Sequence, residues 1–101
     1  MSSYSISELA LKDIDEIWIY TLEKWSLEQA DRYYLLIIQE INYLSHNPNS
    51  GKSIDYIRLG YRSSKVKSHI IFYKINESKK IEIIRVLHEK MDFENRLMDT
   101  E

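Results

Sequence analysis

The chain of 101 residues contains no cysteine. This absence excludes disulfide scaffolds, thiol catalysis, iron–sulfur clusters and structural zinc sites that need thiolates. A chain without cysteine also fits the reducing cytoplasm, which is where we expect the protein to act.

Glycine and proline are almost as scarce, with two and one residues respectively. Two glycines cannot supply a glycine-rich phosphate loop, and no serine stands in a G-x-S-x-G elbow. Hydrophobic residues make up 44% of the chain and charged residues 30%, a composition that excludes a disordered or fibrous protein. At this length we expect residues 1–101 to form a single domain with one hydrophobic core.

Long hydrophobic runs are also missing. The longest, Tyr33 to Ile38, has six residues, whereas a membrane helix needs roughly 20. The segment Met1–Ser5 has neither a basic region nor an apolar region of the kind that a secretion signal carries. The sequence therefore predicts a protein that is neither exported nor inserted into a membrane.

Charge is distributed unevenly along the chain, although the net charge is only −2. Residues 1–51 carry eight acidic and three basic side chains, and residues 52–90 carry four acidic and ten basic ones. A basic region of this kind either binds an anionic partner or simply solvates the surface. The pI near 5.9 is far below the value of about 9 typical of proteins that coat nucleic acid. We therefore expect a protein partner or a protein–nucleic acid complex, and no sequence-specific binding to nucleic acid alone.

The first half of the sequence predicts a short strand and two helices. Tyr4 to Ser7 alternates as a strand does, and Ser7 is a suitable N-cap for a helix of about 17 residues. Ser26, with Gln29 three residues later, forms a capping box that starts a second helix ending near His46. Both helices carry one apolar stripe, so we expect an antiparallel helical hairpin.

The second half changes to the period of strands after the breakers between His46 and Gly51. Residues 55–62 alternate, while residues 68–75 and 81–87 are apolar on both faces and are separated by a polar turn. The last two runs are therefore predicted to form a central antiparallel hairpin, followed by a short closing helix or a partly free tail. The predicted fold class is α+β, with a β-α-α-β-β-β order and two layers.

The residues that could carry chemistry are mostly cations of the predicted sheet, and we expect them to line one face of it: Arg58, Arg62, Lys65, Lys67, Tyr73, Arg85 and His88. Such a set could stabilise a phosphodiester transition state, with histidine as the proton carrier, or hold the acidic side chains of a protein. His46 and His69 fit structural roles at element ends. No histidine has the spacing of a metal ligand, so we predict neither a metal site nor a cofactor.

The remaining candidates lie on the predicted helices. Asp13 and Glu16 are one turn apart, and we expect both on a solvated face. Trp18, Trp25 and Tyr34 fit the apolar stripes and are predicted to be core residues. An excess of aliphatic residues predicts an exposed groove that receives a partner's helix or strand: Ile19, Leu22, Leu35, Leu36 and Ile38.

Taken together, these residues resemble the ParE branch of the ParE/RelE superfamily of type II toxin–antitoxin toxins, over nearly the whole chain. The helical part of the resemblance rests on Ala10, Asp13, Ile17, Tyr20, Thr21, Trp25, Gln29, Ala30 and Tyr33, and the loop part on Leu44, Pro48 and Gly51. Its most specific part is the block of Ile57–Arg62, Ser68–Tyr73, Ile83–His88 and Met91–Asp92.

The resemblance implies a two-layer toxin that a cognate, ParD-like antitoxin neutralises by folding a disordered segment across it. In this family ParE members act on DNA gyrase, whereas RelE members cleave messenger RNA on the ribosome. RelE-like nucleases tend to be strongly basic, so the acidic pI of this chain favours the noncatalytic, gyrase-directed activity. A nontoxic interaction module is a third possibility.

Each hypothesis assigns roles to particular residues. The antitoxin is expected to contact Ile19, Leu22, Leu36, Arg58 and Arg85. The target is expected to contact Arg58, Arg62, Tyr73, Arg85, His88 and Met91. If the protein were instead a nuclease, the catalytic set would be Arg62, Lys67, Arg85 and His88.

Overall fold

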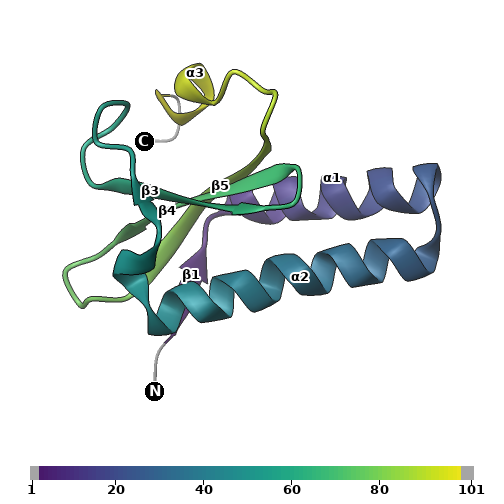
Figure 1. Cartoon of the computed structure of the whole chain (residues 1–101), viewed down its shortest axis with the longest axis horizontal. Coiled ribbons are helices and arrows are strands. Elements are labelled where there is room, and N and C mark those ends of the chain that lie inside the picture. The colour runs from purple at the N-terminus through teal and green to yellow at the C-terminus, as the bar shows by residue number, and fades with distance from the viewer. Residues whose placement is uncertain (1–2, 99–101) are drawn as a thin grey trace.

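A computed structural model describes residues 3–98 of the chain; residues 1, 2 and 99–101, at the ends of the predicted domain, lie outside the described part. A helical hairpin covers one face of a twisted sheet, and a short C-terminal helix lies on the other (Figure 1). The elements are β1 (Tyr4–Ile6), α1 (Glu8–Lys24), α2 (Leu27–His46), the 3₁₀ turn η1 (Pro48–Ser50), β2 (Lys52–Ser53), β3 (Tyr61–Val66), β4 (His69–Ile75), β5 (Ile81–His88) and α3 (Phe93–Met98). The predicted α+β fold is confirmed, α3 is the closing helix that the sequence offered as one alternative, and β2 and η1 are additions. Within residues 3–98 no helix has the length and apolarity needed to cross a membrane.

Both predicted helix starts are confirmed by their capping hydrogen bonds. The Ser7 hydroxyl accepts from the Ala10 amide at 3.0 Å and donates to the Ile84 carbonyl at 2.8 Å, so the same side chain caps α1 and fixes it to β5. The Ser26 hydroxyl accepts from the Gln29 amide at 3.1 Å and starts α2 directly after the turn between the helices.

The sheet has the strand order β1-β5-β4-β3-β2. β4 and β5 pair in the antiparallel manner predicted and lie centrally, while β1 joins β5 in parallel. Alternate residues of β4 face two different cores: Ile71 and Tyr73 pack towards the helical hairpin, and Phe72 packs towards α3. Leu97 of α3 is fully buried in this second core, so the C-terminal segment forms the closing helix and not a free tail.

The predicted strand over residues 55–62 is wrong, because β3 begins only at Tyr61. The amides of Ile57 and Arg58 both donate to the Ile54 carbonyl, and the Asp55 carboxylate accepts from the Gly60 amide at 2.9 Å. These local turn hydrogen bonds outweigh the alternating pattern, since a short polar side chain can satisfy the backbone without a partner strand.

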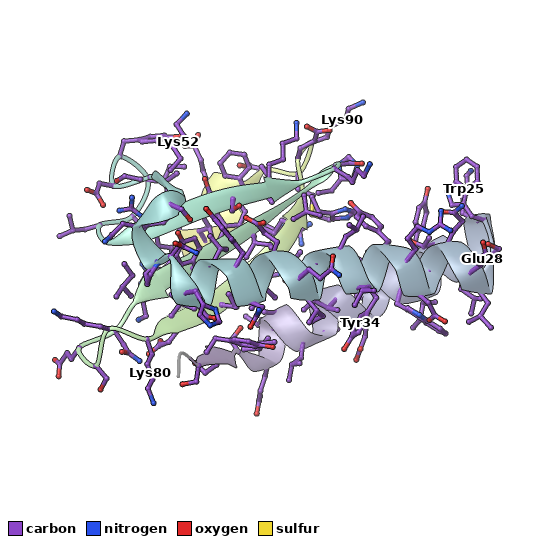
Figure 2. The ribbon with its side chains drawn as sticks, turned by 60° about the horizontal axis from the view of Figure 1, so that its bottom comes forward. Trp25, Glu28, Tyr34, Lys52, Lys80 and Lys90 are labelled. Carbon is purple, nitrogen blue, oxygen red and sulfur yellow. The ribbon has the colours of Figure 1, made fainter. Side chains whose placement is uncertain are left out.

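Three aromatic residues predicted to lie in the core are not buried there. Trp25 is 71% exposed and Tyr34 is 44% exposed. Trp18 is half-buried, and its indole N–H donates to the Asp31 carboxylate at 3.0 Å. Trp25 is exposed because the tip of the hairpin, around Trp25 and Glu28, projects beyond the sheet (Figure 2).

Gly51 is required by close packing and not by its backbone conformation. The hydroxyl of Tyr73, a fully buried residue, accepts from the Gly51 amide at 3.0 Å and donates to the Pro48 carbonyl at 2.8 Å. A Cβ at position 51 would overlap the Tyr73 hydroxyl and lie 2.9 Å from the Ser63 carbonyl oxygen. Gly60 is the opposite case, with a left-handed φ of 84° and open space around it.

Gly51→Ala is therefore expected to lower the free energy of unfolding by about 2 kcal/mol, because the new methyl group displaces a buried ring. Gly60→Ala is the matched control and should cost about 1 kcal/mol through backbone strain alone. Urea denaturation of both variants measures the difference. Equal losses would contradict the packing role of Gly51.

Candidate functional site

A partly buried ion pair joins α1 to β5. The Asp13 carboxylate accepts from Arg85 Nε at 2.8 Å, from Arg85 Nη2 at 2.9 Å and from the Val86 amide at 3.0 Å. The hydrogen bonds between the Arg85 guanidinium and Asp13 raise the pKa of Arg85 above its ordinary value, so the guanidinium stays charged. Arg85 adjoins a register irregularity, across which Phe72 opposes Arg85 but Tyr73 opposes Ile83. The irregularity accompanies the turn of the Arg85 side chain towards α1.

The prediction that Asp13 lies on a solvated helix face is wrong, since it is only 8% exposed. Asp13 follows Ala10 by three residues and precedes Ile17 by four, which places it on the buried stripe of α1. This spacing was the signal in the sequence for a paired, buried carboxylate. Glu16 is exposed, as predicted.

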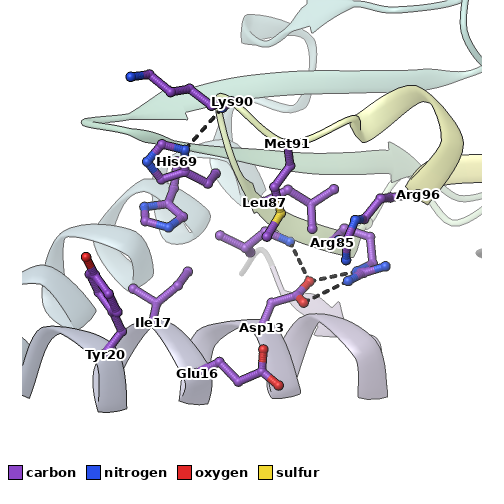
Figure 3. A pocket seen from close by; sticks show the side chains of 12 residues that line it. Asp13, Glu16, Ile17, Tyr20, His69, Arg85, Leu87, Lys90, Met91 and Arg96 are labelled. Carbon is purple, nitrogen blue, oxygen red and sulfur yellow. Dashed lines mark hydrogen bonds and ion pairs between the residues drawn. The ribbon is translucent and has the colours of Figure 1, made fainter. Parts of the chain in front are cut away.

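A cavity of about 450 Å³ opens beside this ion pair, between α1, the end of β5 and the C-terminal segment (Figure 3). Lys90 and Arg96 line its C-terminal side, and Glu16 lines it on α1. It is lined by Asp13, Glu16, Ile17, Tyr20, His69, Arg85, Val86, Leu87, His88, Lys90, Met91 and Arg96.

Two histidines and a tyrosine lie where β4 begins and β5 ends. His69 and His88 are register partners, and their rings meet edge to face with centroids 5.2 Å apart. The Tyr33 hydroxyl is hydrogen-bonded to His69 Nδ1 and lies 3.2 Å from the Val66 carbonyl oxygen. The Lys90 amide donates to His88 Nδ1 at 3.1 Å. Burial, aided by His88, lowers the pKa of His69 to about 4, so His69 is neutral near pH 7.

A second cavity of about 610 Å³ shares Tyr20, His69 and His88 with the first. It extends under the tip of the helical hairpin and is lined by Tyr20, Thr21, Trp25, Gln29, Arg32, Tyr33, Leu36, Lys67, Ser68, His69 and His88. We call the two cavities together the hairpin cleft. Four predicted site residues line the hairpin cleft without an ion pair to another residue in the described part of the chain. Lys67, His88 and Leu36 line the second cavity, and Met91 lines the first.

The other predicted site residues on the hairpin side of the sheet are engaged in the fold. Arg62 donates to the carbonyls of Asn49 at 2.9 Å and Gly51 at 2.8 Å, and so holds the loop before β2. Tyr73 is fully buried behind the same loop and cannot contact a target. Their predicted target-binding roles are therefore not supported by their positions.

Two further cations lie towards α3, on the opposite face. Arg58 Nη1 donates to the Leu97 carbonyl at 2.8 Å, and the guanidinium lies over the Tyr61 ring. Lys65 forms an ion pair with Glu89 at 2.7 Å. The prediction of one continuous basic face is wrong, because β-strand alternation places Lys65 and Arg62 on opposite faces. Arg85, predicted to contact both partners, is bound to Asp13 and lines the first cavity.

The predicted apolar groove is only partly formed. Leu36 lines the second cavity, and Ile19 and Leu35 are exposed on the helices. Leu22 is half-buried, whereas Ile38 packs against the core and is not available to a partner.

Comparisons with known proteins agree with this arrangement. The profile of a family described as ParE toxin of type II toxin-antitoxin system, parDE, matches residues 4–93. The chain belongs to the ParE toxin family. Toxin ParE1 of Mycobacterium tuberculosis (strain ATCC 25618 / H37Rv) is 35% identical over 96 residues, which cover 95% of this chain and 98% of the relative. Toxin ParE1 of Caulobacter vibrioides is 36% identical over 92 residues, covering 91% and 94%.

Solved structures show the same fold as this ParE-family chain. A chain described as the chromosomal ParDE TA system from P. aeruginosa superposes with a TM-score of 0.75 at 20% identity, covering 87% of this chain and 96% of that one. A chain of the toxin–antitoxin complex RelBE2 from Mycobacterium tuberculosis gives 0.64 at 19% identity, covering 86% and 96%. The second likeness confirms the expected relation to the RelE fold.

Asp13→Asn in this ParE-family chain is expected to lower the free energy of unfolding by about 3 kcal/mol, because it leaves the charge of Arg85 without its partner in a partly buried position. Asp15→Asn, on the exposed face of the same helix, should change stability by less than about 0.5 kcal/mol. Urea denaturation at pH 7 measures both variants. Losses of similar size would contradict the structural role of the ion pair.

Stability is expected to fall as the pH is lowered from about 6.5 to about 4, because the unfolded chain protonates His69 near pH 6.5 whereas the folded chain resists until about pH 4. The part due to His69 should be on the order of 2 kcal/mol, reduced by the hydration that a half-exposed ring retains. Urea denaturation across this range should show a shallower pH dependence for His69→Gln. His46→Gln, at the exposed end of α2, is the control, and an equal change in both variants would contradict the assignment to His69.

Proposed function

We propose that this ParE-family toxin acts without catalysis by binding and inhibiting DNA gyrase, and that a cognate ParD-like antitoxin neutralises it. Membership of the ParE family supports a type II toxin. The structural similarity to a protein described as part of a ParDE toxin–antitoxin system supports an antitoxin partner. The proposal places the protein in the cytoplasm, where the sequence also predicts it.

The observation that carries the noncatalytic part is the dispersal of the alternative nuclease set. Acid–base catalysis at a phosphodiester needs its groups within hydrogen-bond reach of one phosphate. Arg62 is bound to backbone carbonyls near Gly51, and Arg85 is bound to Asp13. Lys67, Arg85 and His88 line the hairpin cleft, but the Arg85 guanidinium is held by Asp13 and Arg62 lies outside the cleft.

The surface that remains for macromolecular contact differs from the predicted one. Lys90 and Arg96 have no ion pair among residues 3–98, and they lie beside the partly exposed Met91 at one end of the cleft. A protein target that bears carboxylates would find here both charge and apolar area. We propose that this C-terminal rim contacts gyrase and that an antitoxin in the adjoining cleft blocks the contact.

The purified chain is expected to inhibit gyrase in a supercoiling assay and to leave labelled message intact in a translating ribosome mixture. Arg96→Glu should weaken the inhibition about tenfold by reversing a rim charge. Lys80→Glu is the matched control, since Lys80 lies on the β4–β5 turn, before β5, whereas Lys90 follows the other end of that strand (Figure 2). Cleaved message with unaffected supercoiling would overturn the proposal in favour of a ribosome-dependent nuclease.

A further inference from the structure

The cations lining the hairpin cleft outnumber the carboxylates available to them. Arg32 and Lys67 line the second cavity, and Lys90 and Arg96 line the first. Of the two lining carboxylates, Asp13 is bound to Arg85, which leaves only Glu16. Arg32 is 3.5 Å from Glu28, but both side chains of that pair are largely exposed, so it neutralises Arg32 weakly. This excess of cations favours a negatively charged occupant of the cleft.

The second cavity also offers unusual aromatic area for a charged site. Tyr20 is 62% exposed and Trp25 71% exposed, and both line this cavity together with the half-buried Tyr33. The tip of the hairpin projects beyond the sheet, so the Trp25 indole has no covering layer (Figure 2). Large exposed rings beside cations favour a ligand with a bulky apolar side chain next to its acidic groups.

Backbone strain at Lys67 points to the same cavity. Lys67 and Ser68 form the two-residue turn between β3 and β4, and Lys67 has a left-handed φ of 55°. Glycine or asparagine adopts this conformation at far lower cost in such a turn. The turn nevertheless contains a lysine in a strained backbone conformation, and the side chain of this lysine lines the second cavity. Strain that persists at a binding surface is a physical reason to test the side chain for function.

Lys79 provides an internal comparison. It also has a positive φ, of 64°, in the turn between β4 and β5. It lines neither cavity of the hairpin cleft. Replacing either lysine by glycine therefore removes a similar backbone strain, but only one replacement removes a cation from the cleft.

We propose that the hairpin cleft is an anchoring site for an acidic peptide segment, in which Lys67 holds a carboxylate of the peptide and Tyr20 and Trp25 pack against a neighbouring aromatic or large aliphatic side chain. The occupant is a segment of the antitoxin, so the assignment of the occupant rests on the proposed function. The chemistry of the anchor rests on the cleft alone.

A random peptide library selected on the full-length chain tests the anchor without knowledge of the antitoxin. The selected peptides should be enriched in Asp or Glu next to Trp, Phe or Leu. Lys67→Gly should weaken the binding of a selected peptide about tenfold, because a charge-assisted hydrogen bond is lost. Lys79→Gly should leave binding unchanged. The urea midpoints of the two variants should agree, which separates loss of binding from loss of fold.

Tryptophan fluorescence reports where the peptide binds. The chain has two tryptophans, so Trp18→Phe leaves Trp25 as the reporter. A selected peptide that lacks tryptophan should shift the emission of this variant to the blue as the indole is covered. Selected peptides that are neutral or basic, equal binding by both glycine variants, or unchanged emission would each overturn the proposal.

Two further measurements decide the occupant. The selected peptide should displace the antitoxin from its complex with the chain, and failure to do so would overturn the antitoxin as occupant. Binding of a labelled single-stranded RNA or DNA is measured for the wild type and for Lys67→Gly. If the wild type binds the nucleic acid and the variant does not, the cleft is a nucleic-acid site and not a peptide site. The peptide measurements do not depend on gyrase, so a chain that binds acidic peptides but does not inhibit supercoiling would refute the proposed function and not the anchor.

Discussion

The ion pair between Asp13 and Arg85 is the interaction on which the arrangement of the two layers depends. A single carboxylate accepts three hydrogen bonds from β5, two from a guanidinium and one from a backbone amide. Because the amide of Val86 belongs to a central strand, the carboxylate fixes both the depth and the rotation of α1 relative to the sheet. Ser7 makes a similar connection to β5 at the start of the same helix. The cleft beside the pair exists because α1 is fixed at both points.

The length of the helical hairpin explains why this cleft is open. α1 and α2 have 17 and 20 residues, about 25 to 30 Å at the rise of an α-helix, and the end of the hairpin that holds Trp25 and Glu28 projects beyond the sheet (Figure 2). The helices therefore bury their first or last turns against the sheet and leave the connecting tip uncovered. The aromatic residues near this tip are exposed for this reason, although their spacing is that of core residues.

The sequence was sufficient to predict the features that depend on neighbouring residues. Ser7 and Ser26 cap the helices as predicted, and the polar turn after Ile75 joins two central strands. Features that depend on the packing of distant elements were missed. Nothing local distinguishes Trp18, half-buried between helices, from Trp25, which is exposed at the tip. The prediction that Asp13 lies on the surface fails because its partner, Arg85, is 72 residues away in the sequence.

The basic half of the sequence shows why composition alone could not locate the binding surface. A region rich in cations was expected to form one basic face, yet strand alternation distributes those cations over both sides of the sheet. Several are then used by the fold itself: Arg62 satisfies loop carbonyls, Arg58 satisfies the end of α3, and Arg85 satisfies Asp13. Each of these contacts removes a donor from the set that a partner could use. The cations that can bind a partner are those at the cleft that no acceptor within residues 3–98 engages. Identifying them requires the positions of the internal acceptors as well as those of the cations.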